Sequence, residues 1–267
     1  MLASITTAAL VATSVVAAST SATAAAAAAA SAAVETKFQG YARNTATTDY
    51  LPNKCYYDNI WGDRISAGES HFAYVLKPDW HNASVCGQCA TVKVTGATGS
   101  ARTRPVTVLI TSYDDNVLCP TGDPRCQPGS LLLSTQAYRD MFYGTTPSSA
   151  PIEWELVPCP DDFVKGNVEF FFHPGTSNGY ISLQPRNFRR AVGKIELEYA
   201  DGTVAEFGQP GDIVDYGSYR TLLPANPDAL HQGFTIRAYA RDSDDTVEVH
   251  FDKIPAGSST VQADGQF

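Results

Sequence analysis

All six cysteines of this 267-residue chain lie between positions 55 and 159, and no cysteine follows. An even number clustered in this way is typical of a disulfide-tied secreted domain, and the spacing alone leaves the connectivity open. Cys86 and Cys89 also have the spacing of a redox dithiol or of half a zinc site. The five histidines offer no second ligand pair at a suitable spacing. We therefore predict structural disulfides and no metal.

The N-terminal segment indicates export. The first 34 residues contain no charged side chain, and an apolar stretch, Leu2–Ala18, precedes a run of seven alanines. This order is typical of a signal peptide. A membrane anchor is the alternative, but several serines and threonines make the stretch too polar for a good span. We expect residues 1–33 to be the signal peptide and Ala-rich leader of a secreted, extracellular protein. The sequon at Asn82 is then a candidate glycosylation site.

The charge of the chain restricts its partners. With 19 Lys+Arg against 28 Asp+Glu, the net charge is −9. A protein that repels phosphate groups is a poor candidate for binding nucleic acid or an anionic membrane. The sequence contains no phosphate-binding loop, dinucleotide fingerprint or zinc-protease motif, so we expect no cofactor. We expect a monomer with a neutral partner.

Regular β alternation begins after the turn-rich segment that follows Cys159. In residues 194–199, every second side chain is apolar and the charged residues take the other face. Asp201-Gly202 then supplies a two-residue hairpin turn. Roughly six to eight such short strands predict a β-sandwich over residues 160–255. The Gly/Ser-rich residues 256–267 predict a flexible tail.

The first half is also mainly β. Strands rich in Val, Ile and Thr are predicted at 91–95, 106–111 and 152–156. One helix is predicted, with Ser134 capping its start and Gly144 ending it. Helices and strands do not alternate as they would in a parallel α/β sheet. Residues 34–159 therefore predict a disulfide-tied β-barrel.

Two segments could carry hydrolytic chemistry. Gly175–Gly179 matches the nucleophile elbow of serine hydrolases, which requires a strand, a strained turn and a helix. Because Tyr180 begins a predicted strand, a hairpin loop is the preferred interpretation. Glycoside cleavage generally needs two carboxyl groups that flank the bond. Asp114 and Asp115 follow the strand 106–111 and are the candidates, with a solvated acidic loop as the alternative.

Several motifs occur in a specific order along the chain. They are Gly40-Tyr41-Ala42, the Cys-Gly-Gln-Cys segment with its strand at 86–94, the residues 129–138 that lead into the helix, the strand at 152–159 and the segment 175–187. In this order and spacing, residues 38–255 resemble the expansins and their microbial expansin-like relatives.

The resemblance implies a fold and a function. The fold is all-β, with a six-stranded double-psi β-barrel followed by an immunoglobulin-like β-sandwich that binds polysaccharide. The function is binding of cell-wall polysaccharide, cellulose or a related β-glucan, with wall loosening that does not involve hydrolysis. A weak endoglucanase-like glycoside hydrolase and a secreted effector or surface-binding protein are the alternatives.

The sequence departs from the family pattern in the barrel groove. Leu132 and Ser112 stand at two family acidic positions, and Arg43 stands at a family threonine. If two residues are inserted after the strand, Asp114 takes the second acidic position. Leucine cannot donate a proton, and Asp114 and Asp115 are adjacent instead of lying on opposite sides of a groove. We therefore expect no catalytic residue and no hydrolysis, with Asp114 and Ser112 contacting sugar hydroxyls.

The resemblance also implies a disulfide pattern. Cys55 is expected to pair with Cys86, and Cys89 with Cys159. The remaining two cysteines, Cys119 and Cys126, then form the third pair.

In the family, three aromatic residues on the sandwich hold the apolar faces of sugar rings. Alignment places Tyr180 and Tyr216 at two of these positions, and Gly179 takes the place of a tryptophan at the remaining one. Tyr219 is close in sequence and is a further candidate. Packing of Tyr180 and Tyr216 in the core is the alternative.

Overall fold

The computed structural model describes residues 37–45, 54–55, 70–96, 102–114, 122–123, 125–143, 146–177, 179–208, 218–222 and 232–267. The predicted leader, residues 1–33, lies outside this part of the chain. Residues 35–267 form one compact unit, in which strands dominate the described secondary structure. The prediction of an all-β protein is confirmed. Within the described ranges, no helix is long and apolar enough to cross a membrane.

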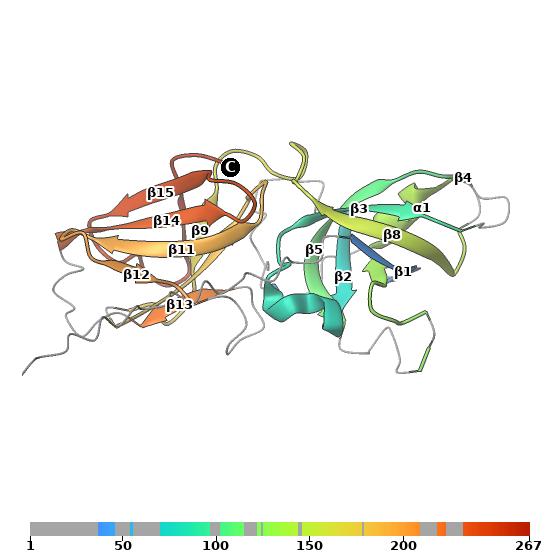
Figure 1. The fold of residues 1–267 in the computed structure, drawn as a ribbon, viewed down its shortest axis with the longest axis horizontal. Helices are drawn as coiled ribbons and strands as arrows, with labels where there is room; N and C mark the ends of the chain where they lie inside the picture. The colour runs from blue at the N-terminus through green and yellow to red at the C-terminus, as the bar shows by residue number, and fades with distance from the viewer. Residues whose placement is uncertain are drawn as a thin grey trace, which may run out of the picture. The chain divides into compact units, whose positions relative to one another are not determined.

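Six strands of the first half close into a barrel (Figure 1). Their order is β1-β6-β2-β5-β3-β8, and the pairs β1–β6 and β2–β5 are parallel. A 3-10 helix, η2, follows β2, and a short pair, β4–β7, forms a separate sheet. The bounds are β1 (Lys37–Asn44), β2 (Phe72–Leu76), η2 (Lys77–Ala83), β3 (Cys89–Val94), β4 (Arg102–Thr103), β5 (Val106–Asp114), β6 (Leu131–Leu133), β7 (Phe142–Tyr143) and β8 (Ser149–Val157).

Apolar side chains at alternate positions fill the barrel. Phe38 of β1 points into the core, while its sequence neighbours point outward. Its ring stacks on Trp154 of β8 with centroids 4.0 Å apart, and the Trp154 indole N–H donates to the Gly129 carbonyl at 2.7 Å. A Cβ atom at Gly40 would collide with the backbone of Gly129. Glycine is therefore required where these two segments cross.

The predicted helix is α1 (Thr135–Met141). Ser134 caps it as expected, because its hydroxyl accepts the backbone N–H of Ala137 at 3.2 Å. The helix ends earlier than predicted. Phe142 already has an extended backbone and pairs with Thr103 in the β4–β7 sheet, and its side chain is buried. Strand pairing therefore ends the helix, and Gly144 lies outside the described residues.

Eight strands of the second half form two four-stranded sheets. One sheet has the order β13-β10-β9-β16, and the other has the order β12-β11-β14-β15 (Figure 1). Their inner faces share one apolar cluster that includes Phe170, Leu183, Leu197 and Ile236. The bounds are β9 (Glu169–Phe172), β10 (Tyr180–Arg186), β11 (Val192–Tyr199), β12 (Val204–Glu206), β13 (Tyr219–Leu222), β14 (Phe234–Ala240), β15 (Thr246–Phe251) and β16 (Ser259–Gln262).

The hairpin predicted at Asp201-Gly202 connects β11 to β12. The Asp201 carboxylate accepts the backbone N–H of Thr203 at 2.8 Å, and Gly202 has a φ of 81°. Glycine adopts this left-handed conformation without the strain that a side chain would add.

The prediction of a flexible tail at 256–267 is wrong. Residues 259–262 form β16, which pairs with β9 at the edge of its sheet. Beyond it, Ala263 and Phe267 are buried in the sandwich core. The Gly/Ser-rich composition suggested a loop, but these apolar residues give the segment a face to bury.

Two disulfides join the described cysteines of the barrel. Cys55 is bonded to Cys86 and Cys89 to Cys159, which are the pairs that the resemblance implied. Cys126 is also disulfide-bonded. Its expected partner, Cys119, lies outside the described residues, so that pairing stays a prediction.

Candidate functional site

A row of side chains crosses four strands on the outside of the barrel. By strand register, Arg43 on β1 lies opposite Leu132 on β6, Leu132 opposite Tyr74 on β2, and Tyr74 opposite Ser112 on β5. Leu132 and Tyr74 belong to a small apolar cluster that is separate from the barrel core. This row contains one guanidinium group and no carboxylate. We call Arg43, Leu132, Tyr74 and Ser112 the outer row.

A β-bulge on β5 decides which residues join this face. The register between β2 and β5 shifts so that Thr111 has no direct partner on β2. Before the bulge, Val108 and Ile110 point into the barrel core; after it, Tyr113 does. The extra residue thereby turns Ser112 and Asp114 outward, as bulges commonly do near functional sites.

The structure brings Ser112 and Asp114 onto one face, but both are buried. Each is only 5% exposed. The Ser112 hydroxyl accepts the backbone N–H of Lys54 at 3.1 Å and donates to the Tyr113 carbonyl at 3.3 Å. Asp114 lies opposite Leu76, and Asp115 is outside the described residues. Within β5 itself, Asp114 is the only residue with a carboxyl side chain.

A charged cluster adjoins the Arg43 end of the outer row, and the sequence reasoning did not identify it. Asp123 accepts two hydrogen bonds from the Arg125 guanidinium, at 2.9 and 2.7 Å, and lies 3.6 Å from Arg43. Arg43 also donates to the Cys126 sulfur at 3.2 Å. The Arg125 hydrogen bonds hold the pKa of the Asp123 carboxyl well below its usual range. In the sequence, the Asp-Pro-Arg segment within a Pro/Gly-rich stretch was the feature that could have indicated this ion pair.

On the sandwich, Tyr180 begins β10 and is half-buried. Its neighbour Ile181 points into the core, so Tyr180 lies on the opposite, outer face of the sheet. The backbone N–H groups of Ser177 and Tyr180 each donate to the other residue's carbonyl, at 2.8 and 3.2 Å. A strand therefore follows the Gly175–Gly179 segment, which confirms a hairpin loop instead of a nucleophile elbow.

The expectation that Tyr219 binds sugar is wrong. Tyr219 is 4% exposed and belongs to the sandwich core, and its hydroxyl donates to the Val192 carbonyl at 3.0 Å. Burial raises its pKa to about 12. A ring enclosed in this way cannot stack on a polysaccharide. Tyr216 lies outside the described residues.

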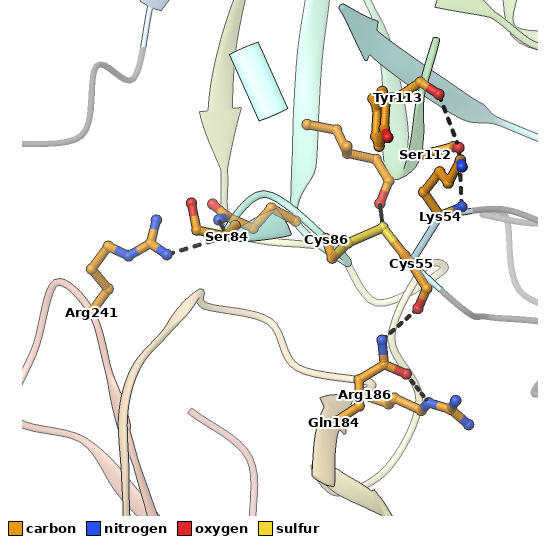
Figure 2. The surroundings of a disulfide bond; sticks show 11 residues. Lys54, Cys55, Ser84, Cys86, Ser112, Tyr113, Gln184, Arg186 and Arg241 are labelled. Carbon is orange, nitrogen blue, oxygen red and sulfur yellow. Dashed lines mark hydrogen bonds between the residues drawn. A yellow bond between two sulfur atoms is a disulfide. The ribbon is translucent and has the colours of Figure 1, made fainter. Parts of the chain in front are cut away.

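Polar side chains are buried on the outer face of the sheet that contains β10. Arg186 donates to Gln184 at 2.7 Å, and its guanidinium lies 3.7 Å from the centroid of the Phe171 ring. Figure 2 shows the side-chain amide of Gln184 donating to the carbonyl of Cys55 beside the Cys55–Cys86 disulfide. These hydrogen bonds satisfy polar groups whose burial would otherwise be costly. They hold this part of the face in one arrangement.

Two further predictions concern glycosylation and metal binding. The backbone of Asn82 lies in η2, and its side chain is outside the described part of the molecule. Among the described residues, no group of three or more His, Cys, Asp or Glu side chains could hold a metal ion.

The described strands form an all-β protein with an expansin-like fold. The chain is similar to the apo crystal structure of expansin from Clavibacter michiganensis, with a TM-score of 0.61 at 17% sequence identity, covering 86% of this chain and 97% of that chain. A mutant of that expansin in complex with cellohexaose aligns with the same TM-score and coverage at 16% identity. No protein-family model and no curated protein matches the sequence. The similarity shows the fold and confirms the predicted likeness to expansins.

Proposed function

We propose that this protein is a secreted, monomeric, expansin-like protein that binds cell-wall polysaccharide, cellulose or a related β-glucan, and loosens walls without hydrolysis. In this proposal, residues 34–159 form a double-psi β-barrel and the residues from 160 onward form an immunoglobulin-like β-sandwich. The observation that carries the proposal is an expansin-like fold whose outer row contains no carboxyl group.

The absence of hydrolysis follows from the chemistry of the outer row. Glycoside cleavage generally uses one carboxyl group as an acid and a second as a base or nucleophile. Leu132 is 1% exposed and has no proton to donate, and Asp114 is buried on β5, which β2 separates from the strand of Leu132. Asp114 and Ser112 are proposed to contact sugar hydroxyls without taking part in bond cleavage.

Polysaccharide binding is assigned to the outer face of the sandwich. Tyr180 presents a partly exposed ring there, and Tyr216 is the proposed second platform. Sugar rings have apolar C–H faces that aromatic rings can cover while the hydroxyl groups remain in water. The complex of the Clavibacter expansin with cellohexaose supports this ligand class. The disulfides of the barrel support an extracellular location.

Depletion of the full chain onto insoluble cellulose tests the proposal. Tyr180→Ala/Tyr216→Ala is expected to weaken retention by about a hundredfold, because each stacking ring contributes roughly 1–1.5 kcal/mol. Tyr143→Ala is the matched control, since this ring on β7 is 53% exposed and lies outside the proposed site. Equal retention of the wild type and the folded double variant would contradict the assignment.

A further inference from the structure

A groove of about 420 Å³ lies on the outer face of three neighbouring barrel strands, β1, β8 and β3. None of the side chains assigned above to polysaccharide binding lines it. Its size falls within the range of small-ligand sites. Its lining residues are Lys37, Phe38, Gln39, Thr91, Lys93, Glu153, Trp154 and Glu155.

Strand register arranges the polar lining in two rows. In one row, Glu155 of β8 lies between Lys37 of β1 and Thr91 of β3. In the other row, Glu153 lies between Gln39 and Lys93. Side chains at such opposite positions are neighbours on the same face of the sheet. Each row therefore presents hydrogen-bond donors and acceptors across three strands. We call this set the β1–β8–β3 groove.

Most of these polar groups have no protein partner. Lys37 and Glu155 form an ion pair at 3.5 Å. Among the described residues, the side chains of Gln39, Thr91, Lys93 and Glu153 make no hydrogen bond, ion pair or ring contact. Lys93 and Glu153 lie directly opposite each other but do not pair. Their hydrogen-bonding capacity therefore remains available to a ligand.

The strands beneath the groove are held in one arrangement from the core side, where the rings of Phe38 and Trp154 lie. Phe38 and Trp154 stack with an interplanar angle of 15°, and the Trp154 indole is fixed by its hydrogen bond to Gly129. On each side of β8, the register continues without a shift through the lined positions. A site built on such fixed strands loses little conformational entropy when it binds a ligand.

We propose that the β1–β8–β3 groove binds a short segment of a neutral oligosaccharide. Its two lysines and two glutamates balance in charge, so a charged ligand would gain no net attraction. A sugar hydroxyl both donates and accepts, and the groove offers ammonium and amide donors together with carboxylate and amide acceptors. This proposal rests on the proposed polysaccharide binding and adds a second contact to it. The sandwich would bind one part of the glycan, and the barrel groove would bind another.

The test is an NMR titration of the full chain with cellohexaose and xylohexaose as probes. We expect shifts of the Gln39 side-chain amide and the Thr91 methyl group. Lys93→Ala/Glu153→Ala is expected to weaken the binding that these signals report by about tenfold or more, because it removes hydrogen bonds to charged groups. Asp252→Ala/Lys253→Ala is the matched control, since both residues are exposed and lie outside the groove.

The outcomes separate this proposal from the sandwich site. The groove shifts are expected to persist in Tyr180→Ala/Tyr216→Ala, so a failure of the sandwich assignment would leave them unchanged. Absence of shifts at Gln39 and Thr91 with both neutral probes would overturn the groove proposal, even if cellulose retention is normal. Tighter binding of trigalacturonic acid than of cellohexaose at the groove would overturn the neutral ligand class.

Discussion

Tyr180 and Tyr219 lie on adjacent strands of one sheet, and their side chains point to opposite faces. Tyr180 is on the outer face, whereas Tyr219 is in the core, where its hydroxyl donates to Val192. The sequence could not separate them, because a shift of one residue in a strand exchanges its two faces. Tyr180 was chosen by family alignment and stays a prediction, whereas Tyr219 was chosen only because it is close in sequence to Tyr216.

Leu132 shows a second limit at the scale of residues. Alignment identified it as a departure from an acidic family position, but the sequence could not reveal its surroundings. The structure packs Leu132 against Phe72, Tyr74 and Leu76, outside the barrel core. The replacement is therefore an apolar contact as well as the loss of an acid.

Truncation of this side chain tests the contact. Leu132→Ala is expected to lower the free energy of unfolding by about 2–5 kcal/mol, because it leaves a cavity at a buried site. Leu132→Met preserves most of the volume and is expected to cost less than about 1.5 kcal/mol. Urea unfolding followed by tryptophan fluorescence measures both. Equal stability of the alanine variant and the wild type would mean that the cluster is loosely packed.

At the scale of strands, alternation of apolar and polar residues predicts a strand only where one face of that strand is exposed to water. It predicted β11, β14 and β15, whose outer faces carry charged residues. In β10, six of the seven residues are buried, and Ser182, Gln184 and Arg186 are polar residues hidden on its outer face. The bulge at Thr111 had no glycine or proline to mark it, so the predicted strand ended at 111 whereas β5 continues to Asp114.

Strand β16 was missed because its neighbours in sequence are glycine, serine and alanine. Its contribution can be measured by removing residues 256–267. The truncated chain is expected to lose at least about 2 kcal/mol of unfolding free energy, because Phe267 leaves the core and β9 loses its partner strand. Gln266→Ala in the full chain is the control, because it removes the hydrogen bonds of one terminal side chain and leaves β16 in place. An unchanged urea midpoint for the truncated chain would contradict the assignment of this segment to the sandwich core.

At the scale of the whole molecule, we predict that acid stability depends on a buried histidine in the sandwich. His173 follows β9, is 8% exposed and shares a hydrogen bond of 2.6 Å with the Ser218 hydroxyl. Burial, with the positive charges of Arg186 and Arg220, lowers the pKa of His173 from 6.5 to about 4. The imidazole is therefore neutral in the folded protein at pH 7.

The pH dependence follows from the difference between the two states. As the pH falls below 6.5, the unfolded chain binds a proton at His173 while the folded protein does not, so the free energy of unfolding decreases. The loss continues down to a pH of about 4 and amounts to about 3 kcal/mol. His173→Gln cannot bind this proton and is expected to lack this part of the pH dependence. His250→Gln, on an exposed side chain, is the control. Urea unfolding between pH 7 and 4 measures the difference, and parallel curves for His173→Gln and the wild type would show that His173 does not control acid stability.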